Sequence, residues 1–175
     1  TVMLELRARF EEAANLLWKN ELEEAGVTVL LGRPTWKVHA KICSIRRKEG
    51  NNIRHYGFVC TGNLNEQTAK VYGDHCLLTA HPVIMADINR VFQYLENPKN
   101  HTHLLKACKK LVLSPFQLRN QMIKFIDHEI KDARNNKPAS LTVKLNALSD
   151  PILMNKLSEA ARNGVEINLI IRGIC

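Results

Sequence analysis

The chain has 175 residues, 45% of them hydrophobic, and its 25 Lys and Arg against 17 Asp and Glu give a net charge of +8. It can bury one substantial core or two small ones, and no apolar run approaches the roughly twenty residues of a membrane helix. Five cysteines without a Cys-x-x-Cys pair favour neither a disulfide framework nor a zinc site, and they fit a reducing cytoplasm. The charge suits a polyanionic partner. Charge alone does not show whether the partner is nucleic acid, polyphosphate or an anionic membrane surface, or whether the charge only keeps the protein soluble.

The first part of the chain alternates between strand-like and helix-like patterns. A strand is expected over residues 2–6, and apolar residues at helical spacing predict a helix from Phe10 to Gly26. The charged residues 46–52 are expected to form a solvated hairpin turn. Four strands are predicted in this region, over residues 27–31, 36–45, 53–60 and 75–79.

A helix should begin at Pro82 and end near Glu96. We expect its apolar side chains to face the sheet, namely Val83, Ile84, Ile88, Val91 and Leu95. The polar residues 97–103 predict a linker, and a long amphipathic helix follows Ser114-Pro115 and ends near Asn135.

The last part of the chain repeats an α/β pattern. A strand is predicted over residues 141–145, then a helix capped by Asp150 and closed by Gly164, and a strand over 165–171. Residues 157–169 echo residues 22–30, because each has a helix, a glycine stop and a buried strand. This order is also the ordinary pattern of α/β proteins, so the echo alone does not establish a duplication.

The strongest functional signal is Lys-Val-His-Ala-Lys at residues 37–41. Alternate side chains of a strand share a face, so we expect His39 and Lys41 to point into the same space. Thr-Gly-Asn-Leu-Asn at 61–65 follows another apolar strand and can bring small donor groups, including Asn63, against this pair. A nucleophilic histidine, a fixed positive charge and neutral donors together predict a phosphoryl site. Alone, such a histidine is more often a surface residue, and such an asparagine often only stabilises a turn.

These two segments resemble the paired His-x-Lys and Gly-x-Asn segments of the phospholipase D superfamily, whose members attack phosphate esters through a histidine. More narrowly, six ordered segments are similar to motifs of the histidine-phosphorylating, bacterial type of polyphosphate kinase. They are residues 8–12, 37–41, 61–65, 68–72, 77–80 and 171–173. The resemblance covers essentially the whole chain, so the sequence resembles an internal piece of that enzyme's C-terminal catalytic region.

The resemblance implies an α/β fold in which a phospholipase D-like mixed sheet is flanked by helices. Residues 1–110 would form the first catalytic domain, which bears the phosphorylated histidine. Residues 111–175 would begin a second, similar domain that is cut before its own histidine segment. The resemblance also implies a cytoplasmic enzyme that forms a homo-oligomer at full length and binds no nucleic acid. Membrane association of the full-length enzyme, and activity of this piece by itself, are left open.

The resemblance also implies the chemistry. His39 would take the terminal phosphoryl group of ATP, release ADP and pass the group to inorganic polyphosphate. Lys41 and Asn63 would stabilise the charge on the transferred group. Magnesium would arrive on the nucleotide, because the sequence has no cluster of carboxylates that would form an all-protein cage. Three more residues are expected near the magnesium-bearing phosphates, the nucleotide and the ATP phosphates respectively: Arg9, Tyr72 and Arg172.

Two other classes of function stay open. A phospholipase D-like phosphodiesterase or nuclease would use His39, Lys41 and Asn63 but transfer the phosphoryl group to water. A kinase would lengthen polyphosphate with ATP, whereas a hydrolase of that class would not. A non-enzymatic polyanion-binding module would tolerate the loss of His39 and bind more weakly as salt rises. A stable phosphohistidine would exclude the binding module.

Overall fold

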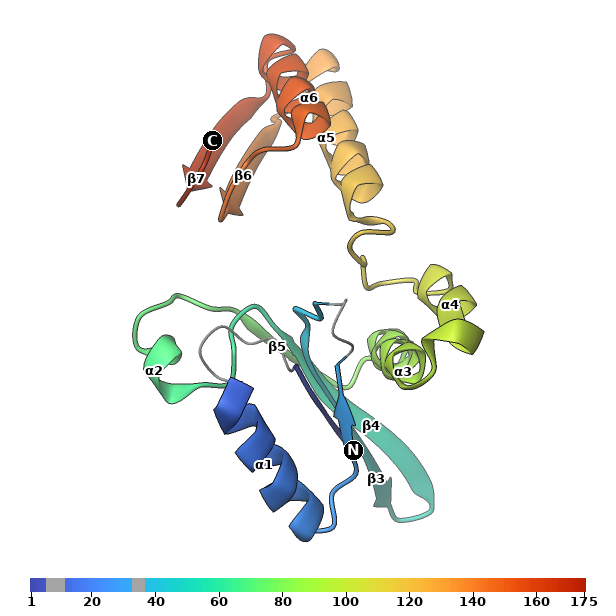
Figure 1. Ribbon diagram of the computed structural model, residues 1–175. Coiled ribbons are helices and arrows are strands. Elements are labelled where there is room, and N and C mark those ends of the chain that lie inside the picture. The colour runs from blue at the N-terminus through green and yellow to red at the C-terminus, as the bar shows by residue number, and fades with distance from the viewer. Residues whose placement is uncertain (6–11, 33–36) are drawn as a thin grey trace. The chain divides into compact units, whose positions relative to one another are not determined.

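The computed structural model describes residues 1–5, 12–32 and 37–175, and it divides the chain into two compact units, Thr1–Lys110 and Leu111–Cys175 (Figure 1). The first unit contains β1 (Val2–Leu4), α1 (Glu12–Glu24), β2 (Val29–Leu31), β3 (Lys41–Glu49), β4 (Asn52–Cys60), α2 (Glu66–Ala69), β5 (Cys76–Thr79), α3 (Pro82–Glu96) and α4 (Pro98–Lys106). The second contains α5 (Leu118–Arg134), β6 (Ser140–Leu145), α6 (Pro151–Arg162) and β7 (Glu166–Ile171). The α/β class is therefore confirmed.

Parallel and antiparallel strands lie in separate sheets within the described ranges, where one mixed sheet was predicted. β1 pairs with β2 in parallel, and β3, β4 and β5 form an antiparallel sheet in that order. In the second unit β6 pairs with β7 in parallel. No strand pairing within the described residues joins β2 to β3, which is why the first unit has two small sheets.

The β3–β4 hairpin is longer than predicted. β3 begins at Lys41 and continues to Glu49, which pairs with Asn52, so the turn consists of residues 50–51 alone. Gly50 has a φ of +59°, the left-handed conformation that two-residue hairpin turns require. The charged residues that were expected in the turn extend the strands instead. Glu49 lies 3.8 Å from Arg47 and 3.4 Å from Arg54, so ion pairs balance part of their charge.

Helix α3 packs against the β3–β4–β5 sheet and supplies most of the buried residues that the structure describes in the first unit. It begins at Pro82, as predicted, and the Nδ1 atom of His81 accepts a hydrogen bond from the Val83 N–H at 3.2 Å. Its buried apolar residues are Met85, Ile88 and Val91. Three residues that were predicted to face the sheet are half-buried instead, namely Val83, Ile84 and Leu95.

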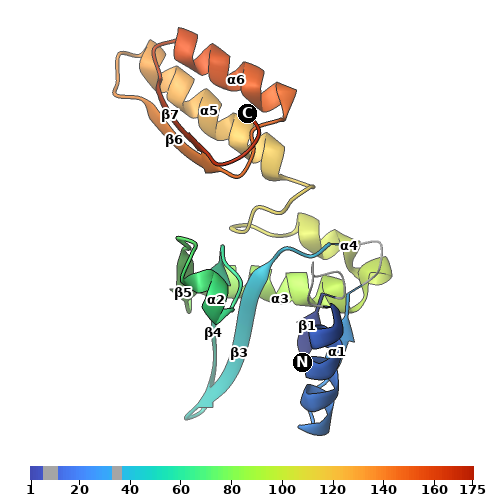
Figure 2. The ribbon, with the colours of Figure 1, turned by 60° about the vertical axis from the view of Figure 1, so that its left-hand side comes forward.

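The linker predicted at residues 97–103 is wrong, because this segment forms most of α4 (Pro98–Lys106). Pro98 occupies the first turn of the helix, where the missing N–H costs nothing. Pro98 and Leu105 are buried, and α4 packs beside α3 in both views (Figure 1 and Figure 2). The apolar residues of α4 hold this largely polar helix in place, and the composition of the segment alone did not reveal their contacts.

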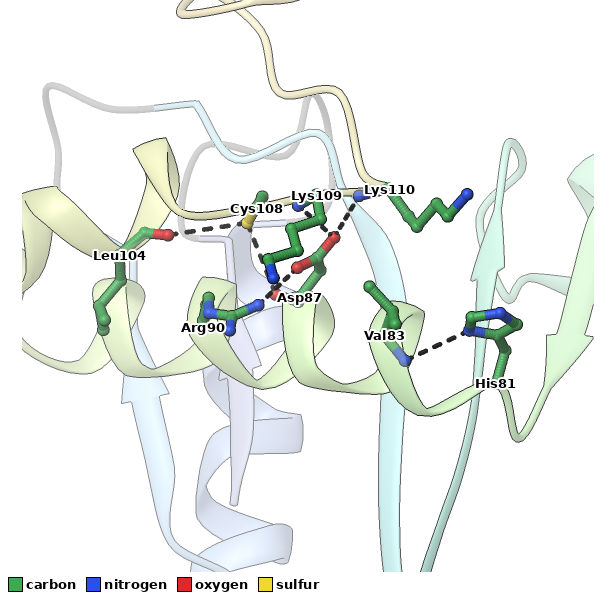
Figure 3. A network of polar contacts seen from close by, with 8 residues as sticks. All are labelled: His81, Val83, Asp87, Arg90, Leu104, Cys108, Lys109 and Lys110. Atoms are coloured by element: carbon green, nitrogen blue, oxygen red, sulfur yellow. Dashed lines mark hydrogen bonds and ion pairs between the residues drawn. The ribbon is translucent and has the colours of Figure 1, made fainter.

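A buried aspartate joins α3 to the segment that follows α4 (Figure 3). Asp87 is 0% exposed, and its carboxylate accepts hydrogen bonds from Arg90 Nη1 at 2.6 Å and from the backbone N–H groups of Lys109 (2.9 Å) and Lys110 (2.7 Å). A buried charge is costly unless it is paired and hydrogen-bonded, as here. The Asp87 network therefore holds the last residues of the first unit against α3.

The second unit follows the predicted order of elements. The carboxylate of Asp150 caps α6 by accepting hydrogen bonds from the N–H groups of Ile152 (3.0 Å) and Leu153 (3.1 Å). Gly164 ends the helix with a φ of +88°. Helices α5 and α6 cover one face of β6 and β7 (Figure 1). The core between them consists of Ile126, Ile130, Leu148, Leu157, Ala160 and Val165.

Across the described ranges, no helix is both long enough and apolar enough to cross a membrane.

We expect Asp87→Asn to lower the free energy of unfolding of the first unit by about 2 to 3 kcal/mol, because an amide cannot accept all the hydrogen bonds of the buried carboxylate. Urea unfolding followed by circular dichroism measures this loss. Glu23→Gln is the matched control, since Glu23 is an exposed residue that pairs with Lys19 at 2.6 Å. The control should change stability by less than about 1 kcal/mol. Equal losses in the two variants would contradict a structural role for the Asp87 network.

Candidate functional site

The candidate site lies at one end of the antiparallel sheet. Lys41 is the first residue of β3, Cys60 the last of β4 and Cys76 the first of β5, and the strand register places the three side by side. Three segments that lack regular structure meet at this end, namely residues 37–40, 61–65 and 73–75. The sheet therefore gathers loops that lie far apart in the sequence. We call this end of the sheet the site edge.

His39 and Lys41 lie together at the site edge, although not for the reason that the sequence suggested. The strand predicted over residues 36–45 included His39, but β3 begins at Lys41 and His39 precedes it. The ammonium group of Lys41 lies 3.1 Å from His39 Nδ1 and 3.0 Å from Nε2, and it donates a hydrogen bond to the His39 carbonyl oxygen at 3.1 Å. The Lys41 side chain thus contacts both the ring and the backbone carbonyl of His39.

The ammonium group lies outside the plane of the His39 ring. It is about equally far from both ring nitrogens, and a group in the ring plane at such distances from both would clash with Cε1. Ring lone pairs point outward within the ring plane. Lys41 therefore supplies positive charge beside the ring and does not itself occupy the in-plane direction of the unprotonated nitrogen.

The charges at the site edge favour a neutral histidine. Partial burial lowers the pKa of His39, and the positive charges of Lys41 and Lys37 lower it further. Burial also lowers the pKa of Lys41, and negative charge on Asp74 and Cys60 opposes that effect. Because a free histidine titrates at a pKa of about 6.5, the lowered pKa keeps His39 in its nucleophilic form at neutral pH.

Asp74 is a site residue that the sequence analysis missed. Its carboxylate accepts a hydrogen bond from Thr61 Oγ1 at 3.0 Å, and Thr61 Oγ1 in turn accepts one from the His75 N–H at 2.9 Å. The carboxylate also packs against Gly62 so closely that a Cβ atom there would collide with it. Asp74 thus holds the loop after β4 against the loop before β5. The sequence carried no clear signal for it, because the approach of Asp74 to Gly62 follows from the register of β4 and β5.

Asn65, rather than Asn63, stabilises the turn that follows β4. The Asn65 side chain accepts hydrogen bonds from the N–H groups of Gln67 (2.9 Å) and Thr68 (3.0 Å), and so caps α2. The Asn63 carbonyl accepts a hydrogen bond from the Asn65 N–H at 2.9 Å, and the Asn63 residue is exposed. Asn65 therefore has the capping role that the sequence analysis considered for Asn63.

Comparison with family models assigns both units of the chain. Residues 1–102 match the model described as polyphosphate kinase C-terminal domain 1, and residues 111–175 match the model described as C-terminal domain 2. The chain belongs to the polyphosphate kinase family.

Individual polyphosphate kinases agree with this assignment. The chain is 43% identical over 175 residues to the polyphosphate kinase of Vibrio parahaemolyticus and 41% identical over 175 residues to that of Escherichia coli. The crystal structure of polyphosphate kinase from Porphyromonas gingivalis superimposes with a TM-score of 0.76 at 30% identity, covering 99% of this chain and 29% of that one. All of the chain aligns with the two curated relatives, and it spans 25% of the length of each.

The other residues expected from the polyphosphate kinase motifs lie in the loop between α2 and β5, in the second unit, and outside the described residues. Tyr72 is 51% exposed in the loop between α2 and β5, and its N–H donates to the Thr68 carbonyl. Arg172 follows β7 in the second unit, where its Nε donates to Asn146 Oδ1 at 2.8 Å. Arg9 lies outside the residues that the structure describes. The roles of all three stay predictions.

The described residues contain no group of three or more His, Cys, Asp and Glu side chains arranged to hold a metal ion. A magnesium ion in a phosphoryl-transfer site is usually held by one or two carboxylates together with the phosphates of the substrate. Asp74 supplies one carboxylate at the site edge. The donors in the described part of the chain therefore fit an ion that is carried by a nucleotide.

We expect Lys41→Met to raise the pKa of His39, because it removes a positive charge that disfavours the imidazolium ion. The pKa should stay below its ordinary value, since burial is the larger cause of the lowering. NMR titration of labelled histidine rings measures the shift. Lys48→Met is the control, because Lys48 lies seven residues further along β3, about 23 Å away. An unchanged His39 titration in Lys41→Met would contradict the electrostatic coupling.

Proposed function

We propose that the chain carries the phosphohistidine centre of a polyphosphate kinase, which transfers the terminal phosphoryl group of ATP reversibly to inorganic polyphosphate. The observation that carries the proposal is the His39–Lys41 contact, with the ring nitrogens 3.1 and 3.0 Å from the ammonium group. The relatives are polyphosphate kinases, which supports the reaction class. The net charge of +8 suits a polyanionic substrate.

In the first step a neutral ring nitrogen of His39 attacks the terminal phosphorus of ATP. The N–P bond forms, the bond from that phosphorus to the bridging oxygen breaks, and ADP leaves with the electron pair. In the second step a terminal oxygen of polyphosphate attacks the phosphohistidine, and the N–P bond breaks. The polyphosphate chain grows by one residue and His39 is neutral again.

In such a transfer, positioned charges and hydrogen-bond donors supply most of the stabilisation of the transition state. In this proposal Lys41 balances the charge on the equatorial oxygens, and Asn63 with the amide groups near Gly62 donates hydrogen bonds to them. One well-aimed donor of this kind is typically worth roughly a hundredfold in rate. Asp74 acts as a positioning residue, because it holds the loop that carries these donors.

Magnesium, when bound with ATP, would neutralise the phosphates and orient them for transfer. We assign to Arg9 and Arg172 contacts with ATP phosphates, and to Tyr72 a contact with the nucleotide, as the family motifs imply. The proposal includes a phospholipase D-like fold for the two domains, a homo-oligomer and a cytoplasmic setting.

ATP labelled on its terminal phosphate tests the covalent step in the native-length protein. We expect an acid-labile, base-stable label on His39 that chases into polyphosphate, and no label in His39→Asn. The matched control is His75→Asn. His75 is an exposed histidine at the same edge, and its backbone makes hydrogen bonds with Thr61. Polyphosphate synthesis without label on His39 would exclude the covalent route. ATP-independent cleavage of phosphodiesters without polyphosphate synthesis would favour a phospholipase D-like hydrolase.

We expect Asn63→Ala to slow phosphoryl transfer roughly ten- to a hundredfold, because it removes a neutral donor without removing the cap of α2. The melting temperature should stay unchanged, since the capping side chain is that of Asn65. Asn51→Ala is the control, because Asn51 is an exposed turn residue at the far end of the β3–β4 hairpin. Single-turnover kinetics measures the rate of transfer and thermal unfolding measures stability, so together they separate a role in transfer from a role in the turn. An unchanged rate with lowered stability would show that Asn63 only supports the turn.

A further inference from the structure

Two cysteines lie directly opposite one another at the site edge. Cys60 ends β4 and Cys76 begins β5, and the antiparallel register pairs them. The next pair outward is Thr61 with His75, and there the Thr61 N–H donates to the His75 carbonyl at 2.9 Å. Antiparallel pairs alternate between hydrogen-bonded and non-hydrogen-bonded kinds. The cysteines therefore occupy a non-hydrogen-bonded pair, the kind in which opposite side chains approach most closely.

This position suits a disulfide bond. Opposite Cα atoms in a non-hydrogen-bonded pair lie about 4.5 Å apart, within the range of about 4.4 to 6.8 Å that disulfides span. A bond between the two sulfur atoms would therefore need small movements of the side chains rather than rearranged strands. Of the other three cysteines, Cys43 lies opposite Phe58, and Cys108 and Cys175 lie outside the strands.

The two sulfur atoms already interact, and solvent reaches one of them. Desolvation of the sulfur, followed by a hydrogen bond with Cys60 and the negative charge there, raises the pKa of the Cys76 thiol. Both cysteines are free thiols, and Cys76 is exposed while Cys60 is half-buried. Lys41 lies beside Cys60 in the same row of the sheet, so its ammonium group would attract a thiolate at Cys60.

We propose that Cys60 and Cys76 form a redox-active pair, which disulfide exchange converts into an intramolecular disulfide next to the phosphoryl site. With glutathione disulfide as the oxidant, the thiolate of one cysteine attacks a glutathione sulfur and releases one glutathione. The second cysteine then attacks the mixed disulfide and releases another. The two protein thiols lose two electrons and two protons, and glutathione disulfide is reduced to two glutathione thiols. Disulfides of this kind in a reducing compartment are usually transient and regulatory.

The disulfide would also change the catalytic site, and this part rests on the proposed function. A disulfide holds its Cβ atoms about 3.8 Å apart, closer than the typical 4.5 to 5.5 Å of an opposite pair. It therefore draws the start of β5 toward the end of β4. Asp74, two residues before Cys76, contacts Gly62 and attracts Lys41, so this movement shifts the groups around His39. Because a displacement of 1 Å can cost about a hundredfold in rate, we expect oxidation to slow phosphorylation of His39 at least about tenfold.

Peptide mapping tests the redox pair without reference to activity. The native-length protein is treated with glutathione disulfide, free thiols are alkylated, and peptides are compared before and after reduction with dithiothreitol. We expect a peptide that joins Cys60 to Cys76, reversed by dithiothreitol and absent in Cys60→Ser and in Cys76→Ser. Cys43→Ser is the control and should leave the joined peptide unchanged. Fully alkylated Cys60 and Cys76, or stable glutathione adducts on single cysteines, would overturn the proposal.

A second measurement connects the pair to the site. Transfer of labelled phosphate to His39 is followed in reduced, oxidised and re-reduced wild-type protein, so that no variant needs to fold. Loss on oxidation and recovery on reduction support the regulatory part, and equal rates in all three forms overturn it. If the reduced protein transfers no phosphate to His39, the proposed function fails, while the peptide map still decides whether the disulfide forms.

Discussion

The register of the antiparallel sheet is the constraint on which the candidate site depends. Lys41, Cys60 and Cys76 lie in one row because β3, β4 and β5 pair with a single register. A slip of one residue in any strand would turn its side chains to the opposite face. The same register brings together the three loops that carry His39, Asn63 and Asp74. Helix α3 stabilises this arrangement by packing against the sheet at Gly57, where an added Cβ would collide with the Cys43 carbonyl oxygen and contact Met85.

Within that framework the chemistry follows from a short-range interaction between a histidine and a lysine. Lys41 belongs to the sheet, whereas His39 belongs to the preceding loop, and the lysine ammonium group bonds to the carbonyl of the very residue whose ring it approaches. The cation is thus held at a set place outside the plane of the ring. Its charge has two consequences, because it lowers the pKa of His39 and it is available to a phosphoryl group that approaches the ring.

The buried Asp87 shows how the first unit holds its last residues. Its carboxylate joins a side chain of α3 to two backbone N–H groups beyond α4, whereas an exposed ion pair typically contributes less than about 1 kcal/mol. These residues directly precede the second unit, so the Asp87 network defines the point from which the chain continues. One side chain in α3 thus holds the backbone of Lys109 and Lys110 in place.

Local patterns in the sequence determined much of the protein. Helical periodicity and capping residues predicted α3, α5 and α6, and the ordered motifs indicated the polyphosphate kinase family that the comparisons confirmed. The errors have a common cause, since α4, the length of the β3–β4 hairpin and the separate sheets depend on contacts between elements, which the pattern of a single segment does not reveal. Asp74 and the Cys60–Cys76 pair are also matters of tertiary structure. Composition and spacing carry local preferences, whereas the meeting of residues from three strands depends on hydrogen-bond register, which only the folded chain establishes.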